Sequence, residues 1–148
     1  MLRAALLWGG IAAALNLLWE IGQLPLYTLY EHAAFPALAY AVAHCTVGDL
    51  LISLGCYAVA ALATRDVRWP LERPAAGAGI AIAAGFAYTV FSEWLNVSVR
   101  RSWGYAPAMP TLFGIGVSPL AQWLVVPALV FLLTRLTLQR WETSDFSP

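Results

Sequence analysis

Three carboxyl side chains interrupt long apolar stretches of this sequence, and their type and setting suit them to chemistry. Glu20 follows NLLW, Asp49 lies within HCTVGDLLIS, and Glu93 lies within YTVFSEWLN. Placing an ionisable side chain in an apolar environment is costly, so such residues usually serve a function. Buried carboxyl groups are suited to acid and base catalysis or to anchoring a polar ligand. We predict Glu93, Glu20, Asp49 and the nearby His44 as catalytic candidates.

Other polar side chains accompany these carboxyl groups at helical spacing. Asn16, Glu20 and Gln23 recur at i, i+4 and i+7, and Asn96 follows Glu93 by three residues, so each set shares one helix face. Beyond Glu93, an arginine pair and two aromatic residues offer charge and surface for a lipid headgroup. The predicted substrate-binding set is Arg100, Arg101, Asn16, Asn96, Trp103, Tyr105 and Gln122.

The elements that must hold these residues are long apolar helices. Of the 148 residues, 61% are hydrophobic and 11% are charged, whereas a soluble domain has about 25% charged residues. Stretches of about 20 apolar residues, enough to cross a bilayer, recur along the chain. They lack the alternating pattern of a membrane β-barrel. We predict an all-α, polytopic transmembrane bundle, one domain over residues 1–148, with spans at about 2–24, 36–63, 76–97 and 119–138.

Prolines and arginines indicate the connections and the orientation. Pro25 is expected to end or kink the first span, and Pro36 suits the start of the second. Residues 98–118 are predicted to form an outer loop or a re-entrant segment, and the polar tail is expected to fray. The positive-inside rule places the loop at 64–75 and both termini in the cytoplasm. The arginines on that side are Arg3, Arg65, Arg68, Arg73, Arg135 and Arg140, against Arg100 and Arg101 on the other.

This orientation places the polar groups at one level of the membrane. The first span exits outward, so Glu20 lies in its outer half, and the second enters from outside, so Asp49 lies in the outer half or near the midplane. Glu93 lies near the outer end of the third span, and Gln122 near the outer start of the fourth. We therefore predict one polar cluster in the outer half of the bundle. His44 is about 140° around the helix from Asp49, so these two need not meet.

Composition and spacing weigh against several other kinds of site. The formal net charge is zero, without the basic surface expected of a nucleic-acid-binding protein. No tight spacing of metal ligands, phosphate-binding loop or dinucleotide fingerprint is present, so no metal is predicted and the cofactor is left unknown. If Cys45 and Cys56 share a helix, they lie about 16 Å apart, too far for a disulfide within it.

Several segments resemble known membrane proteins. NLLWEIGQLPLYT, HCTVGDLLIS, SEWLN and SPLAQWLVVP together look like a group of small four-helix bacterial membrane proteins, and the likeness covers most of the chain. This resemblance implies a multi-pass protein of the bacterial inner membrane. Glu20, the pair Gly48-Asp49 and QWLVVP are also similar to the emopamil-binding-protein (sterol isomerase) type of helical bundle, which fits a lipid pocket.

Three functions remain open from the sequence. The first is binding or modification of a lipid or isoprenoid at the polar cluster, with the arginine pair at the headgroup. The second is a component of ion- or proton-linked transport, because membrane carboxylates suit proton relays. The third is a non-catalytic assembly partner in a membrane complex. The expected partners are membrane lipid and either a second copy of the chain or another membrane protein, and whether the protein is an enzyme is left open.

Overall fold

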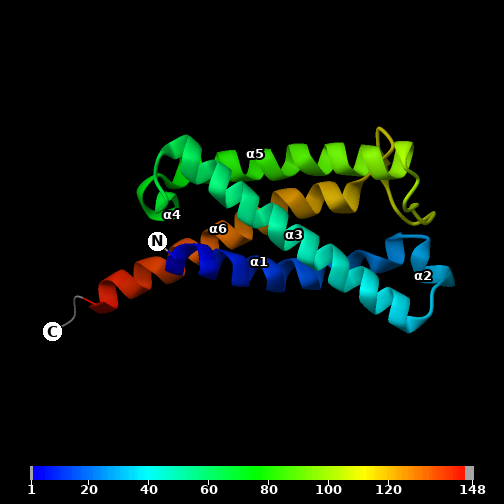
Figure 1. The fold of residues 1–148 in the computed structure, drawn as a ribbon, viewed down its shortest axis with the longest axis horizontal. Helices are drawn as coiled ribbons and strands as arrows, with labels where there is room; N and C mark the ends of the chain where they lie inside the picture. The colour runs from blue at the N-terminus through cyan, green and yellow to red at the C-terminus, as the bar shows by residue number, and fades with distance from the viewer. Residues whose placement is uncertain (1, 146–148) are drawn as a thin grey trace.

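The computed structural model describes residues 2–145, and the chain is predominantly helical, as predicted. The long helices are α1 (Leu2–Gln23), α3 (Phe35–Thr64), α5 (Pro74–Glu93) and α6 (Val117–Asp145). Within the described residues, these helices and their immediate extensions provide four stretches long and apolar enough to cross a membrane. The four run alternately in opposite directions, and α3 and α6 each pack against both α1 and α5 (Figure 1).

The bundle has two unlike ends (Figure 1). The first, which we call the α4 end, holds the start of α1, the end of α6 and the short helix α4 (Trp69–Glu72). The second, which we call the hairpin end, carries the connections between the other helices. Its elements are the 3-10 helix η1 (Leu24–Leu26), α2 (Leu29–His32), the π-helix η2 (Trp94–Val99), β1 (Thr111–Leu112) and β2 (Ile115–Gly116).

Local sequence explains where the helices begin and end. Pro25 lies in η1, where α1 has already ended, and Pro36 and Pro74 lie in the first turns of α3 and α5. Proline fits a first turn because the N–H that it lacks would have no helical partner there. α3 ends at Arg65, whose φ of 55° is left-handed and whose N–H bonds the carbonyls of the last turn.

The last helix is longer than the predicted span at 119–138, and its polar tail does not fray before Asp145. Pro127 lies inside α6, but the helix continues through it. An ion pair between Arg68 beside α4 and Glu142 in α6 holds the polar last turns against the rest of the α4 end. This long-range contact was not readable from the local composition of the tail. Residues 146–148 of that tail lie outside the described residues.

The segment predicted as an outer loop or re-entrant piece contains an antiparallel hairpin. Thr111 pairs with Gly116 and Leu112 with Ile115, so Phe113 and Gly114 form a two-residue turn. Both turn residues have positive φ, 52° and 80°, as a type I′ hairpin turn requires. Phe113 is 97% exposed, so the tip projects from the molecule and is not packed among the helices.

Aromatic side chains fill the core near the α4 end. Trp69, which is fully buried, stacks on Phe131 of α6 at 6.0 Å and meets the edge of Trp8 of α1 at 5.3 Å between ring centroids. Tyr57 of α3 contacts both tryptophans. A Cβ added at Gly77 would lie 2.1 Å from the Trp69 ring, so α5 approaches this cluster closely because position 77 has no side chain. This half of the bundle is tightly packed.

Candidate functional site

A buried polar network joins α1, α3 and α6 in the half of the bundle nearer the hairpin end. Nε2 of Gln122, on α6, donates to Oδ1 of Asn16 at 2.9 Å and approaches Oε1 of Glu20 at 3.2 Å, both on α1. The same amide nitrogen donates to Oδ2 of Asp49 on α3 at 2.8 Å. Gln122 is 2% exposed and Asn16 1%. One amide group therefore links three helices that are far apart in the sequence.

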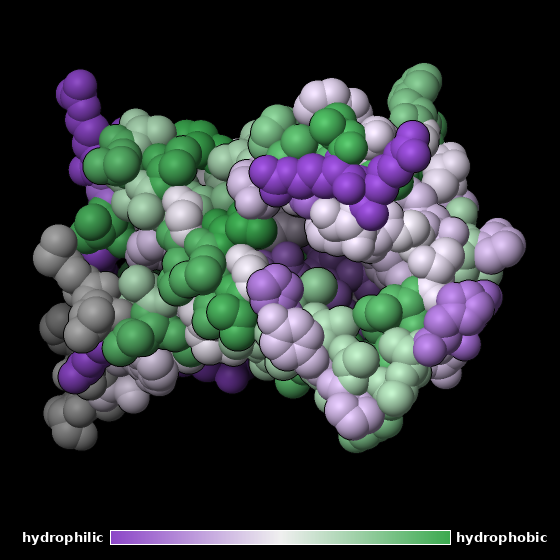
Figure 2. Space-filling model, turned by 45° about the vertical axis from the view of Figure 1, so that its right-hand side comes forward, coloured by the Kyte–Doolittle hydropathy of each residue, from purple (hydrophilic) through white to green (hydrophobic). Residues whose placement is uncertain are grey.

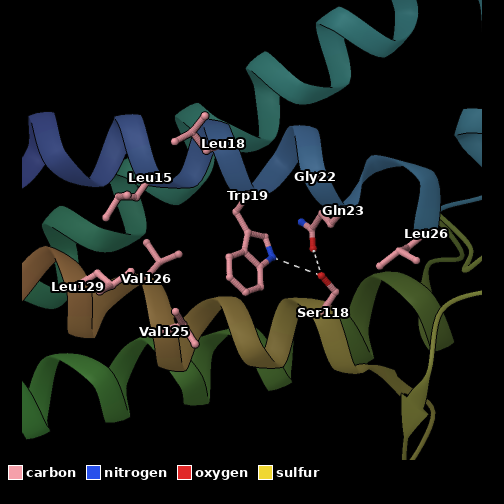
Figure 3. Close-up of a pocket in the computed structure, with 10 residues that line it drawn as sticks. All are labelled: Leu15, Leu18, Trp19, Gly22, Gln23, Leu26, Ser118, Val125, Val126 and Leu129. Atoms are coloured by element: carbon pink, nitrogen blue, oxygen red, sulfur yellow. Dashed lines mark hydrogen bonds between the residues drawn. The ribbon is translucent and has the colours of Figure 1, made fainter.

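The network continues along the contact between α1 and α6 (Figure 3). Nε2 of Gln23 donates to Oε1 of Glu20 at 2.7 Å, and Oε1 of Gln23 accepts from Ser118 Oγ at 2.8 Å. The indole nitrogen of Trp19 donates to the same serine oxygen at 3.3 Å. Figure 3 shows Trp19, Gln23 and Ser118 along a groove of about 420 Å³ whose other labelled walls are mostly aliphatic side chains. The helix face of Asn16, Glu20 and Gln23 thus points at α6.

Glu20 and Asp49 form a pair of neighbouring carboxyl groups. Both accept from Nε2 of Gln122, Glu20 at Oε1 and Asp49 at Oδ2, although they lie on different helices. Glu20 is 8% exposed and Asp49 is partly buried. The amide of Gln122 thus brings the two carboxyl groups together at one wall of the cavity.

A cavity of about 570 Å³ lies next to this network and reaches the hairpin end. Glu20, Asp49, Glu93 and Gln122 line it, and they come from all four long helices. Most of the remaining lining is apolar or aromatic. Figure 2 shows a hollow in this part of the molecule whose interior is hydrophilic and whose surroundings include hydrophobic surface. The cavity thus combines polar groups inside with largely apolar walls.

Glu93 is held by a segment of the loop at the hairpin end, residues 102–106, which we call the strap. Oη of Tyr105 donates a short hydrogen bond to Oε2 of Glu93. The strap is fixed to η1 and the residues that follow it, because the N–H of Ala106 bonds Leu26 O at 2.9 Å and the N–H of Thr28 bonds Gly104 O at 3.0 Å. Ser102 and Trp103 of the strap line the cavity. The strap therefore covers part of the cavity at the hairpin end.

The environment of Tyr105 keeps its phenol protonated. Burial raises the pKa of Tyr105 above its usual value, and the hydrogen bond to Glu93 raises this pKa further. Burial likewise raises the pKa of Tyr27, whose ring centroid lies 5.7 Å from that of Tyr105. An added Cβ at Gly116 would lie 3.0 Å from the Tyr105 ring, so the hairpin also supports this side chain. Tyr105 is thus a firmly placed donor to Glu93 at neutral pH.

A change of helix type directly follows Glu93. The helix widens into η2, in which Arg100 N bonds Leu95 O, five residues earlier, at 2.8 Å. Single π-turns inside helices occur frequently at functional sites. Here Glu93 is 7% exposed and lines the cavity, whereas the next residue, Trp94, is 50% exposed. The π-turn ends the regular helix at the residue that faces the cavity.

The other predicted site residues lie farther from the network. His44 lines the cavity but is exposed, and its ring stacks on Tyr40 at 5.7 Å. Asn96 donates to Ser92 O on its own helix at 2.9 Å and does not line the cavity. Arg100 and Arg101 are exposed and also lie outside the lining. The structure thus brings Glu20, Asp49, Glu93 and Gln122 to one cavity with His44 and Trp103, and leaves the arginine pair outside its lining.

Sequence reasoning did not select several residues that belong to the site. Gln23 shares the face of Asn16 and Glu20, so its spacing was a usable signal for its place in the network. Tyr27 lines the cavity and pairs through its backbone with Tyr105, a contact between distant segments for which the sequence carries no local signal. Gly48, beside Asp49, also lines the cavity, and a Cβ there would meet nothing within 4 Å.

Within residues 2–145, no group of three or more histidine, cysteine, aspartate or glutamate side chains is placed to hold a metal ion. Cys45 is exposed and Cys56 is buried, and both are free thiols. The polar groups of the cavity lining are carboxyl groups, amides, phenols, hydroxyls and indoles, together with the imidazole of His44 and the thiol of Cys45.

No family model, no curated protein and no solved structure matches this chain. The functional interpretation consequently depends on the geometry of the cavity and its surroundings.

Proposed function

We propose that this chain is a multi-pass membrane protein that binds an amphipathic lipid or isoprenoid in the cavity between its four long helices. The observation that carries the proposal is the combination of a polar interior and a largely apolar opening in one cavity of about 570 Å³. This volume lies within the range of typical small-molecule sites, about 300–1,000 Å³. The bacterial inner membrane is the proposed location, which the resemblance to small bacterial membrane proteins supports.

The arginine distribution supports an orientation with both termini in the cytoplasm. Arg65, Arg68 and Arg73 lie in and beside α4, and Arg3 lies in the first turns of α1 at the same end. The hairpin end carries Arg100 and Arg101. Because positive charge is enriched on the cytoplasmic side, the α4 end faces the cytoplasm and the cavity lies in the outer half of the membrane.

The cavity opens sideways between α3 and α5. The two helices separate toward the hairpin end (Figure 1), and the first half of α3 and the last turns of α5 line the cavity there. Tyr40 on α3 is 70% exposed and Tyr88 on α5 is 48% exposed, although both line it. The outer surfaces beside these residues carry exposed apolar side chains such as Val47 and Phe91. In a membrane this opening faces lipid, so a ligand with an apolar body enters from the bilayer.

The packing at the α4 end favours lipid binding over a proton path through one chain. The Trp8, Tyr57 and Trp69 cluster closes the bundle between the polar network and the cytoplasmic side, and Val130 there is fully buried. A relay across the membrane needs a continuous row of polar groups or water. The polar network of this chain instead ends against an aromatic layer.

Filling the cavity tests the proposal. Gly48→Leu adds a side chain to the cavity lining at a position where a Cβ meets no neighbour within 4 Å. Gly55→Leu on the same helix is the matched control, because Gly55 is exposed, has equally open surroundings and does not line the cavity. Each protein is purified in mild detergent, and the lipid that remains bound is extracted and quantified by mass spectrometry.

We expect wild type and Gly55→Leu to retain the same lipid, and Gly48→Leu to lose most of it. Circular dichroism establishes that all three proteins are folded. Equal lipid retention by Gly48→Leu and Gly55→Leu would show that the cavity is not the binding site. Failure of all three folded proteins to retain a specific lipid, or to take one up when it is added back, would overturn the proposal.

A further inference from the structure

We infer that the polar end of the bound lipid is a hydrogen-bond donor, namely a hydroxyl or an ammonium group, and not a phosphate or a carboxylate. This inference rests on the proposed function, because it concerns the ligand of the same cavity. It narrows the ligand class from amphipathic lipids in general to lipophilic alcohols and amines.

The ionisable groups of the cavity lining are predominantly acidic, with three carboxyl side chains against the one imidazole of His44. Glu20, Asp49 and Glu93 come from three different helices and contribute carboxyl groups to it. Among the described residues no arginine lines the cavity, and this chain contains no lysine. An anionic headgroup placed here would meet three carboxyl groups with no arginine or lysine in the described lining to offset the repulsion, and sites that recognise phosphate normally provide arginine, lysine or free N–H groups. The lining therefore selects against phosphate.

The amide donors beside the carboxyl groups are already occupied. Nε2 of Gln122 carries two hydrogens and has three acceptors within 3.2 Å. Nε2 of Gln23 has two hydrogens as well, and it faces Glu20 Oε1 at 2.7 Å and Gln122 Oε1 at 3.2 Å. Neither amide has a hydrogen left for an acceptor on a ligand. Beside these two amides, the carboxyl groups thus offer acceptors in excess of amide donors. The hydroxyl groups of the lining, such as that of Tyr27, can either donate or accept.

Glu93 retains acceptor capacity next to the cavity space. Tyr105 donates to Oε2, and a carboxylate has about four lone-pair sites on its two oxygens. Asp49, which is only partly buried, receives the amide of Gln122 at Oδ2. Glu93 lies next to the strap and Asp49 lies deeper, so a donor group that enters between α3 and α5 meets a carboxyl group at either depth. A hydroxyl or ammonium group satisfies these acceptors directly.

The arginine pair at the hairpin end does not alter this preference. Arg100 and Arg101 are exposed and lie outside the cavity lining, and the strap that follows them contributes Ser102 and Trp103 to the lining instead. A headgroup held at Glu93 therefore meets no guanidinium group in the described lining of the cavity. The inferred ligand contacts carboxyl groups and aromatic side chains, not the arginines.

The test uses three probes with the same tail and different polar ends: hexadecanol, hexadecylamine and hexadecyl phosphate. Each probe is titrated into the purified full-length protein in a non-ionic detergent, and occupancy is measured by native mass spectrometry. We expect wild type and Gly55→Leu to bind the alcohol and the amine at least about tenfold more tightly than the phosphate. Gly48→Leu should lose binding of all three probes.

A second pair of variants tests the role of Glu93. Glu93→Gln keeps a side chain that accepts from Tyr105 but removes the negative charge, so the advantage of the amine over the alcohol should fall several-fold. Glu31→Gln, at the same end of the molecule, removes the same charge from an exposed side chain outside the cavity and should leave the advantage unchanged. An equal response of the two variants would exclude Glu93 from headgroup recognition.

The outcomes separate this inference from the proposed function. Tighter binding of the phosphate than of the alcohol, lost in Gly48→Leu and kept in Gly55→Leu, would overturn the headgroup inference while leaving the cavity as a lipid site. Indistinguishable binding of all three probes by wild type and Gly48→Leu would overturn the cavity proposal itself, and the headgroup inference with it.

Discussion

Replacement of Gln122 by leucine should be among the most destabilising single changes in the polar network. Leucine has a similar volume, so the substitution removes hydrogen bonds without opening a large cavity. The amide supplies two donor hydrogens to Asn16, Glu20 and Asp49, and its oxygen accepts from Gln23. Three bonds, at about 0.6–1.5 kcal/mol each, give a loss of about 2–4.5 kcal/mol in the free energy of unfolding. The lower value reflects measurements on membrane helices.

The assay is reversible unfolding in mixed micelles, with sodium dodecyl sulfate as the denaturant and circular dichroism as the readout. Gln139→Leu is the matched control, because Gln139 is on the same helix but exposed, and it should change stability by less than about 0.5 kcal/mol. A Gln122→Leu protein as stable as wild type would refute the reasoning that this amide holds α1, α3 and α6 together. So would an equal loss in Gln139→Leu, since the effect would then not depend on the network.

Two further predictions concern packing and the strap. Gly85→Ala should destabilise the protein by about 1–3 kcal/mol, because the new Cβ would lie 2.3 Å from the Trp123 ring. The control is Gly79→Ala on the same helix, which lies in open surroundings and should be neutral or stabilising. Similar losses of stability in both variants would contradict this reasoning. Tyr105→Phe should melt below wild type at neutral pH. Because the folded state raises the pKa of this phenol, the stability that it contributes is fully present below about pH 10, its unfolded pKa, and is lost as the pH rises through the folded value. The difference in melting temperature between wild type and Tyr105→Phe should therefore shrink above about pH 10. A difference that grows above that pH would contradict the proposed contribution of the phenol.

The long helices could be predicted from sequence because each depends on local properties. Apolar length determines which stretches can cross a membrane, and Pro36 and Pro74 lie in the first turns of their helices. The alternation of helix direction also placed Glu20, Asp49 and Gln122 at one level, and the structure joins them through hydrogen bonds. The levels of side chains along antiparallel helices follow from counting residues, which requires no knowledge of packing.

The partners of each side chain could not be predicted in the same way. α6 is apolar around most of its circumference, so its hydrophobic pattern does not fix which face meets α1, and Gln122 was not recognisable as the centre of the network. The contact of Tyr105 with Glu93 depends on an irregular strap fixed by backbone bonds to Leu26 and Thr28. Arg100 and Arg101 directly precede that strap, and in the folded chain they lie outside the cavity lining.

The long sequence separation within the polar network has a consequence for how the protein is made. Glu20 and its partner Gln122 are 102 residues apart, and Asn16 and Gln122 are 106 apart. At about 5–20 residues per second, the ribosome produces Gln122 some 5–20 s after Glu20. In the proposed membrane arrangement, α1 and α3 therefore enter the bilayer with their polar side chains before α6 exists. When α6 enters, Gln122 forms the hydrogen bonds that the polar side chains of α1 and α3 lacked until then. During the interval those side chains need temporary hydrogen-bond partners, such as water or the insertion machinery.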